Sequence, residues 1–263
     1  CQGVNIFRQK IDLFFQYTQF MLLDPHIHSE GLGACEIRKM AENGIKKVFS
    51  LYFYPIKPLF PQTLIDGFRR LEEFESARCL AFGVELIPGV GIHPRCIPPD
   101  YETVLDHLEA NDWTLFGEIG LETASEKEVK VFEAQIRIAM AKDIPCVIHT
   151  PRAKKRIVTE KTLEILERLS FPPELGVIDH VNFENLDLLL SKDFWIGLTV
   201  QTEKLSALEV LRIVEEHGTE KFVVNSDAGF GNENVTAIAD VAKLLGKKAE
   251  KVCFKNALKF LGV

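Results

Sequence analysis

Histidines and carboxylates recur at the ends of apolar segments in this sequence, and the first of them are the most closely spaced. The apolar run Met21-Leu22-Leu23 leads into Asp24-Pro25-His26-Ile27-His28. Side chains alternate between the two faces of a β-strand, so His26 and His28 would point the same way, about 7 Å apart. Two imidazoles on one rigid strand can bind a single metal ion. The alternative is a chance His-x-His pair in a turn or on a solvated surface.

Short apolar segments that fit strands alternate with amphipathic segments that fit helices. The expected strands are 22–28, 45–53, 86–93, 115–121, 145–150, 176–181, 195–200 and 222–227. The expected helices are 34–43, 62–80, 101–111, 126–142, 159–170, 183–191, 204–217, 233–245 and 249–261. A strand–helix–strand crossover returns the chain in the same direction, so this alternation predicts a parallel sheet.

Eight such units in about 240 residues is the size of a closed (β/α)₈ barrel, an α/β fold of the TIM type. The alternative is an open doubly wound sheet, but Gly31-Leu32-Gly33 lacks the third glycine of a phosphate-binding loop. No repeat or Ser/Gly-rich linker divides the chain, which predicts a single domain over 21–263. Residues 1–20 fit this pattern poorly and are expected to form a short N-terminal extension of unknown role.

Composition excludes several classes of protein. The net charge of −7 and a pI near 5.6 argue against a broad basic surface for duplex nucleic acid, although bound metal ions can supply local positive charge to a nuclease. No run approaches the roughly 18 uncharged apolar residues that a membrane helix needs. The six cysteines form no Cys-x-x-Cys pair, so we expect packed thiols in a reducing, cytoplasmic protein.

The carboxyl ends of the strands of such a barrel converge on one face, where its chemistry takes place. Of the seven histidines, only His107 and His217 fall within expected helices. The strand ends carry His26, His28, His93, Glu118, His149, His180 and Asp227. Unpaired buried polar groups cost a few kcal/mol each, so a cluster of them needs a compensating charge, which a pair of divalent cations would supply.

These strand-end motifs also resemble a known family. The motifs are Asp24-Pro25-His26-Ile27-His28, Gly91-Ile92-His93-Pro94, Gly117-Glu118-Ile119-Gly120-Leu121-Glu122, Val147-Ile148-His149-Thr150, Asp179-His180 and Asn225-Ser226-Asp227. In this order they resemble the TatD-like metal-dependent hydrolases of the amidohydrolase superfamily. The resemblance extends from Met21 nearly to the C-terminus.

The resemblance implies a site for two divalent metal ions. His26, His28 and Asp227 would bind one ion, His149 and His180 the other, and Glu118 would bridge both. Imidazole and carboxylate ligands suit zinc first, while manganese, magnesium and nickel stay open. Glu118 and Asp227 would be catalytic: a water between the ions would be acidified to hydroxide, and Asp227 would orient it and pass its proton to the leaving group.

The sequence departs from the family pattern beside the implied ligands. Strand six commonly reads His-Cys-Phe-Ser-Gly, but Val181-Asn182-Phe183 follows His180 here. Strand eight commonly reads Glu-Thr-Asp-x-Pro, but this chain has Asn225-Ser226-Asp227-Ala228-Gly229. The arginine expected after the strand-five motif is displaced by Pro151 to Arg152. The metal ligands can therefore be inferred more safely than the substrate.

Three residues are the candidate substrate contacts. His93 could contact substrate or donate a proton, or could instead steady a metal ligand. Arg152 leads the basic run with Lys154, Lys155 and Arg156 and could clamp phosphate bidentately, although such runs are usually solvated helix starts. Arg95 is a further candidate of this kind. Asp24 could support a histidine, and Glu122 either closes its loop or lies on the surface.

Three functions remain open at this level. The first is hydrolysis of phosphodiester bonds in single-stranded DNA, or in a related phosphoester, as the family resemblance implies. The second is hydrolysis of an amide, ester or lactone of a small molecule by the same site. The third is a catalytically idle barrel that binds metal or another ligand. No membrane partner is expected, and the oligomeric state is open.

Overall fold

The computed structural model describes residues 21–231 and 234–262. The predicted division into an extension, 1–20, and one domain, 21–263, stays a prediction because residues 1–20 lie outside the described part. Within that part, the strands are β1 (Leu22–Ile27), β2 (Ile45–Leu51), β3 (Glu85–Gly89), β4 (Phe116–Gly120), β5 (Cys146–His149), β6 (Gly176–Ile178), β7 (Trp195–Thr199) and β8 (Phe222–Asn225). Every pairing between neighbouring strands is parallel.

Two ladders, β1-β2-β3 and β4-β5-β6-β7-β8, are joined at both ends by single bridges. Val90 pairs with Phe116 between β3 and β4, and Ile27 pairs with Ala228 between the end of β1 and the segment after β8. At the second seam, the amide of His28 donates to the carbonyl of Ala228 at 2.7 Å. The sheet therefore closes on itself, which confirms the predicted (β/α)₈ barrel.

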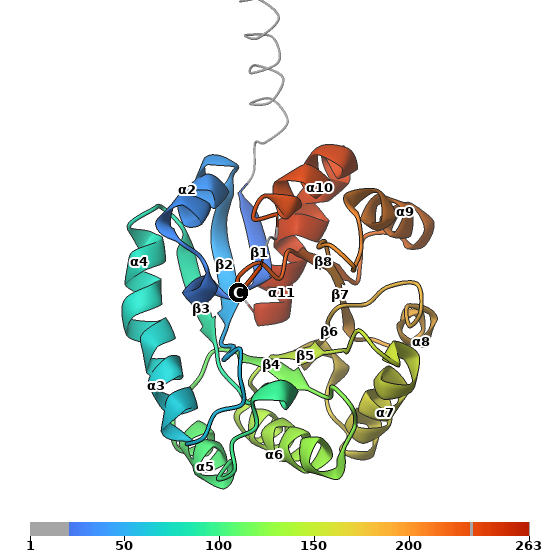
Figure 1. Ribbon diagram of the computed structural model, residues 1–263. Coiled ribbons are helices and arrows are strands. Elements are labelled where there is room, and N and C mark those ends of the chain that lie inside the picture. Colours follow the sequence, from blue (N-terminus) through green and yellow to red (C-terminus); the bar gives the residue numbers. More distant parts are fainter. Residues whose placement is uncertain (1–20, 232–233, 263) are drawn as a thin grey trace, which may run out of the picture.

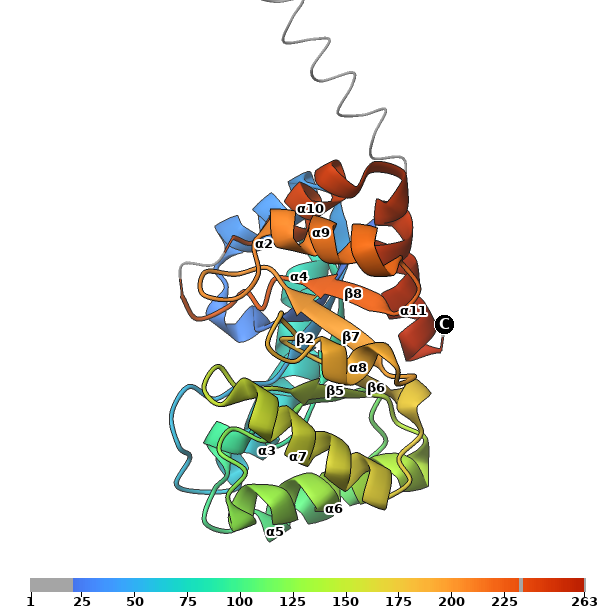
Figure 2. The ribbon, with the colours of Figure 1, turned by 90° about the vertical axis from the view of Figure 1, so that its right-hand side faces the viewer.

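Helices surround the barrel as an outer ring (Figures 1 and 2). They are α2 (Ala34–Glu42), α3 (Gln62–Arg70), α4 (Ser76–Leu80), α5 (Glu102–Ala110), α6 (Glu126–Lys142), α7 (Lys155–Arg168), α8 (Asp187–Leu190), α9 (Ala207–His217), α10 (Ala237–Leu245) and α11 (Asn256–Leu261). A π-helical segment, Leu71–Glu75, joins α3 to α4. The predicted bounds differ from the observed ones at several places. The helix α7 begins earlier than residue 159, α9 and α10 begin later than residues 204 and 233, β3 ends before residue 93, and most of 183–191 is not helical.

Apolar side chains fill both layers of the barrel. The inner cluster takes a side chain from most strands, among them Leu23, Phe49, Val147 and Val223, and Phe260 of α11 packs against it. The larger cluster lies between the strands and the surrounding helices. Strands covered on both faces read as continuous apolar runs, so polar residues within or directly after them need a local reason.

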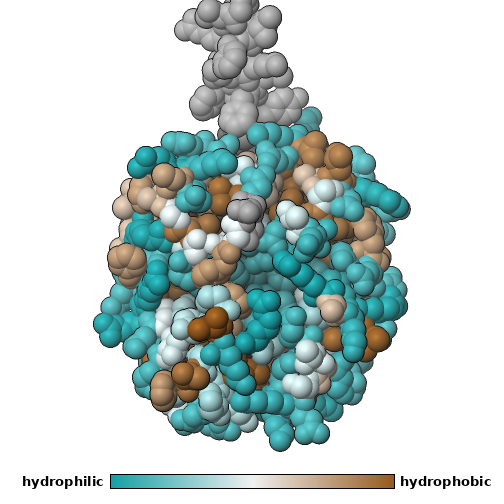
Figure 3. Space-filling model, in the orientation of Figure 1, coloured by the Kyte–Doolittle hydropathy of each residue, from teal (hydrophilic) through white to brown (hydrophobic). Residues whose placement is uncertain are grey.

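The loops that follow the strands lie on the left in Figure 2, at the opposite end of the barrel from α11, and face the viewer in Figure 1. The space-filling view of that face shows mainly hydrophilic side chains around its middle, with hydrophobic ones in separate small groups (Figure 3). None of the helices in the described ranges is long and apolar enough to cross a membrane. The five described cysteines are free thiols, and all but Cys35 are buried.

Candidate metal centre

The polar strand-end residues meet at the mouth of the barrel. His26 lies in β1, Glu118 in β4 and His149 at the end of β5, whereas His180 and Asp227 lie two residues beyond β6 and β8. His28, Glu118, His149, His180 and Asp227 line one cavity of about 330 Å³. These side chains meet because the parallel strands of a barrel present their carboxyl ends at the same rim.

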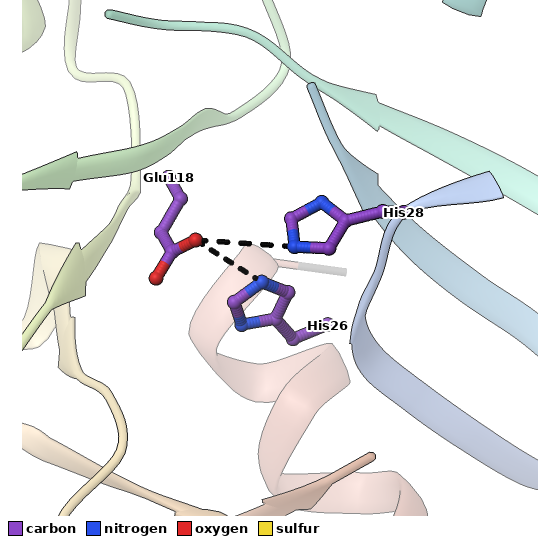
Figure 4. A group of neighbouring side chains, drawn as sticks. All are labelled: His26, His28 and Glu118. Atoms are coloured by element: carbon purple, nitrogen blue, oxygen red, sulfur yellow. Dashed lines mark ion pairs between the residues drawn. The ribbon is translucent and has the colours of Figure 1, made fainter. Parts of the chain in front are cut away.

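The carboxylate of Glu118 lies at the centre of the cluster and divides the imidazoles into two pairs. Its Oε1 atom lies 2.5 Å from His149 Nδ1 and 2.8 Å from His180 Nε2. Its Oε2 atom lies 3.5 Å from His26 Nε2 and 4.0 Å from His28 Nε2. Figure 4 shows the second pair, with both rings facing the same carboxylate oxygen. Each oxygen of Glu118 thus faces one pair of the histidines implied as metal ligands, and Oε2 also faces His93 at 3.5 Å.

On the β1 side, the far nitrogen of each ring is held by an acceptor. His26 Nδ1 lies 2.6 Å from the carboxylate of Asp179, and His28 Nδ1 lies 2.6 Å from the carbonyl of Leu51. Their Nε2 atoms face the centre, where His28 Nε2 lies 3.1 Å from Asp227 Oδ1. His26 Nε2 is buried and has no hydrogen-bond partner among the described residues. A buried imidazole nitrogen without a partner is costly, unless a cation accepts its lone pair.

On the β5 and β6 side, the outer nitrogens have different partners. His180 Nδ1 lies 2.7 Å from the hydroxyl of Thr199. His149 Nε2 lies 2.8 Å from the carboxylate of Glu122, whose side chain is 28% exposed. Glu122 was expected either to close its loop or to lie on the surface, but the structure places it against this histidine.

His93 also reaches the centre, but its two ring nitrogens have different hydrogen-bonding roles from those of the other histidines. Its Nδ1 accepts the backbone amide of Arg95 at 3.1 Å, and its Nε2 lies 3.5 Å from Glu118 Oε2. Burial lowers the pKa of His93 well below its ordinary value. In the neutral ring, the nitrogen that does not accept carries the hydrogen. His93 therefore presents an N–H donor to the centre, which suits a contact to substrate or to Glu118 better than metal ligation.

The charges of the site are strongly coupled. Burial by itself would raise the pKa of Glu118, but the imidazoles of His149 and His26 outweigh it and hold the pKa well below the ordinary value. Burial alone would also raise the pKa of Asp227, but His26 and Lys204 outweigh it and hold the pKa well below the ordinary value. Burial and Lys204 together lower the pKa of His180 to about 4. Both carboxylates are therefore ionised and His180 is neutral at pH 7.

Lys204 was missed by the sequence analysis. It lies between β7 and α9, and its ammonium group contacts Asp227 Oδ2 and approaches His180 Nδ1 to 3.2 Å. It is the first residue of the helix predicted for 204–217, where a lysine is normally solvated. The sequence around Lys204 carries no local signal that it turns inward, because its contacts are with residues that follow two other strands.

The predicted basic run after β5 does not act as one cluster. Arg152 is exposed at the cavity rim and pairs with Glu203 and Gln201. Lys155 turns inward instead and donates to the Thr150 hydroxyl at 3.0 Å and the His180 carbonyl at 2.8 Å. Burial and the nearby Lys204 lower the pKa of Lys155 to about 8.

The remaining basic candidates also separate. Arg156 forms a bidentate pair with Asp187 on the outer surface, away from the cavity. Arg95 lines the cavity, and its guanidinium lies 5.0 Å from the centre of the Phe53 ring. Of the substrate contacts named from sequence, His93, Arg95 and Arg152 all line the cavity.

Asp24 supports the backbone rather than an imidazole. Its carboxylate accepts the Ser226 hydroxyl at 2.6 Å, the Ser226 amide at 3.1 Å and the His26 amide at 3.3 Å. Burial raises the pKa of Asp24 to about 7. Asn225, at the position where the strand-eight motif commonly has glutamate, donates to Asp179 at 2.7 Å. The histidine support at this seam therefore comes from Asp179, to which the sequence analysis gave no role.

The donor set fits a divalent cation. His26, His28 and Glu118 each offer one ligand atom, and these three atoms lie within 4.8 Å of one another. Two further groups meet the same criterion. One is His26, Asp179 and His180, and the other is His93, Glu118 and His149. Imidazole nitrogens and carboxylate oxygens are the ligands that zinc and related ions take in proteins.

Comparisons with known proteins agree with this geometry. A family profile described as "TatD related DNase" matches residues 23–260. The chain belongs to this family. A protein of Methanocaldococcus jannaschii described as an uncharacterised metal-dependent hydrolase is 30% identical over 250 residues, which cover 91% of this chain and 99% of the relative. The crystal structure of a TatD-like protein from Archaeoglobus fulgidus matches with a TM-score of 0.83 and 54% identity, over 92% of this chain and 100% of that one.

Membership in the TatD family confirms the resemblance drawn from the strand-end motifs. The protein is a metal-dependent hydrolase whose His, Glu and Asp side chains form clusters able to bind metal at the mouth of a barrel.

Proposed function

We propose that this TatD-family protein is a two-metal phosphodiesterase that acts on single-stranded DNA ends or a related phosphoester. The observation that carries the proposal is how Glu118 divides the four histidines implied as metal ligands, with one pair facing each carboxylate oxygen. A carboxylate placed in this way can bind two cations at once, and paired cations are typical of phosphodiester hydrolysis.

The ligand assignment follows from the two pairs. His26, His28 and Asp227 would hold one cation, and His149 and His180 the other, with Glu118 shared between them. Zinc is the first expectation, and manganese, magnesium or nickel would also suit these ligands. When bound, such cations supply Lewis acidity and lower the pKa of water at the site.

The side chains of the protein then divide the remaining tasks. Asp227 is ionised and buried beside the centre, so its carboxylate can take a proton from attacking water and return it to the leaving oxygen. His93 points an N–H donor at the same place and can hydrogen-bond a phosphoryl oxygen. Proton transfer thus runs through Asp227, while His93 orients the substrate.

The lining of the cavity supports a phosphoester substrate. Four cationic side chains line it: Arg95, Arg152, Lys155 and Lys204. Phe53 and the half-exposed Phe230 lie on the same cavity with their rings 5.6 Å apart, and offer apolar surface for a base. With a net charge of −7, the protein would hold a short piece of strand rather than a long duplex.

The test is a substrate comparison with the zinc- and manganese-loaded protein. Short single-stranded DNA should release nucleotides, and blunt duplex DNA should release them more slowly. Asp227→Asn should lower kcat by about 10²–10⁴-fold, the usual contribution of a proton-transfer group. His217→Gln, on α9 outside the cavity lining, is the matched control and should retain full activity. Absence of nucleotide release with every metal tried contradicts the DNA assignment.

Hydrolysis of a small amide, ester or lactone is the second candidate. Glu122, Glu184 and Glu203 also line the cavity, and Glu203 pairs with Arg152, so part of the positive charge is neutralised. A neutral acyl substrate would tolerate this lining better than a phosphodiester. A panel of aryl esters, lactones and amides assayed beside the oligonucleotides distinguishes the two, because the preferred class should show the higher kcat/KM.

A further inference from the structure

Asp179 is a buried carboxylate to which the proposed reaction gives no task. It lies directly after β6 and is fully buried. Its Oδ2 atom lies 2.6 Å from His26 Nδ1, across 153 positions of sequence. A charge placed inside a barrel is costly unless its partners are well ordered, so its position needs an explanation.

The surroundings of Asp179 are shaped to hold it in one orientation. Asn225 donates to its Oδ1 atom at 2.7 Å, and the Thr199 hydroxyl lies 3.4 Å from the same oxygen. Gly197 of β7 faces this oxygen, and a Cβ atom at that position would lie only 2.1 Å from it. Any side chain at 197 would therefore displace the carboxylate, and only glycine leaves room for it.

The contact with Asp179 determines which nitrogen of His26 is available. An ionised carboxylate only accepts hydrogen bonds, so Nδ1 of His26 must carry the hydrogen. In the neutral ring the lone pair is then on Nε2, the buried atom without a hydrogen-bond partner among the described residues. That atom is aimed at Glu118 and Asp227, at 3.5 and 3.4 Å. Asp179 thus fixes both the tautomer and the direction of this ring.

Asp179 could instead be a metal ligand, because it forms a group with His26 and His180 of suitable size. Its contacts argue against ligation. One oxygen receives the His26 N–H and the other receives the Asn225 amide, so a cation at this position would displace donors already in place. The carboxylate also lies behind His26, on the side of the ring away from Glu118.

We propose that Asp179 is a positioning residue that holds His26 in the Nδ1–H tautomer, which leaves Nε2 able to bind metal. Gly197 leaves the space for the Asp179 carboxylate, and Asn225 fixes its orientation by a hydrogen bond. The proposal rests on the proposed function only in assigning a metal to His26. The claim that Asp179 fixes the tautomer of His26 does not depend on any activity. Carboxylates that orient a ligating histidine typically contribute about 10–100-fold in metal affinity.

The experiment compares Asp179→Ala, Asp179→Asn and Gly197→Ala with the unaltered chain. Glu118 and Asp227 outweigh burial and raise the pKa of His26 well above its ordinary value, so the tautomer is read at a pH high enough to leave the ring neutral. Under that condition, nitrogen-15 NMR of labelled histidines reports the His26 tautomer without metal, and competition with a chromophoric chelator reports zinc affinity. The unaltered chain should show Nδ1–H for His26. Asp179→Ala and Gly197→Ala should give mixed tautomers and bind the tighter zinc about 10–100-fold more weakly. Asp179→Asn, which can still accept from Nδ1, should lose less.

Asp24→Asn is the matched control, because Asp24 is an equally buried carboxylate that contacts the backbone of His26 and not its ring. It should lower thermal stability and leave tautomer and zinc affinity within about twofold. If Asp179→Ala behaves in the same way, Asp179 is merely structural and the proposal is wrong. If Asp179→Ala does not fold, Gly197→Ala and Asp179→Asn decide by the same criteria. Absence of zinc binding in the unaltered chain refutes the proposed function, while the tautomer measurement still tests the locking.

Discussion

The two sides of Glu118 hold their histidines with groups of different rigidity. On the Oε2 side, His26 is fixed by a fully buried carboxylate and His28 by the carbonyl of Leu51 at the end of β2. Both partners belong to the barrel wall or directly adjoin it. Neither can move without disturbing the packing of a strand end.

On the Oε1 side, the supports are weaker or more accessible to water. His180 is held by the Thr199 hydroxyl, and His149 by Glu122, which comes from a loop and is partly exposed. A hydrogen bond to a partly hydrated carboxylate restrains a ring less than one to a buried group. For the proposed pair of cations, this difference predicts unequal affinities, with the tighter site on the His26 and His28 side.

The largest effect is expected from Glu118→Gln, which affects both sides at once. The amide offers one neutral oxygen instead of two charged ones, so metal content should fall from about two equivalents to one or fewer, and kcat by on the order of 10³-fold. Metal analysis after gel filtration and a kinetic assay measure this. Glu85→Gln, an exposed carboxylate paired with Lys47, is the control. Retention of two equivalents would show that Glu118 does not bridge.

Single histidine variants should remove metal binding from one side of Glu118 at a time. His26→Gln should remove the tighter zinc, whereas His149→Gln should remove the weaker one and leave the tighter affinity within a few-fold. Competition titrations with chelators of different strength separate the two events. His107→Gln on α5 tests for nonspecific loss. Equal losses from both variants would refute the asymmetry between the two sides.

A smaller effect is expected when the exposed support is removed. Glu122→Gln keeps a hydrogen-bond acceptor beside His149 but loses its charge. We expect the weaker zinc to bind less tightly by about 10-fold or less, at the low end of what such supports contribute. The tighter zinc should be unaffected. A loss as large as that from Asp179→Ala would mean that burial does not decide how well a support works.

The smallest effect concerns the loop that carries Glu122. The carboxylate of Glu128 in α6 accepts the amides of Glu122, Thr123 and Ala124 at 2.8 to 2.9 Å. Glu128→Gln should therefore destabilise folding by about 1–3 kcal/mol at pH 7 and loosen the support of His149. Glu126→Gln, exposed in the same turn, is the control and should change little.

The pH dependence of that variant follows from the sign of the shift. Burial alone would raise the pKa of Glu128, but the Thr123 contacts outweigh it and lower the pKa from its value of 4.5. A lowered folded-state pKa stabilises fully above about pH 4.5, and the contribution disappears as the pH falls through the lowered value. Urea unfolding should thus show a large difference between wild type and variant at pH 7 and a small one in acid. An equal difference at both values would contradict the charge-based explanation.

Several local features of the chain were sufficient to predict the fold and the chemistry of its mouth. Alternation of apolar and amphipathic segments indicated the barrel, since each strand must be covered on both faces. Histidines and carboxylates at strand ends, such as His26, His149 and Asp227, indicated one cluster, because parallel strands end at the same rim. The inward turn of Lys204 and the outward pairing of Arg156 were not predictable, since each depends on residues of other elements.

The sequence by itself determined which side chains reach the mouth of the barrel, because strand period and chain direction are local properties. Tertiary structure alone decided how each ring is turned and what holds it. Asp179 meets His26 across 153 positions, in a space left open by a glycine on a third strand. No pattern along the chain encodes such a contact, since its geometry arises only when separate strands pack around one carboxylate.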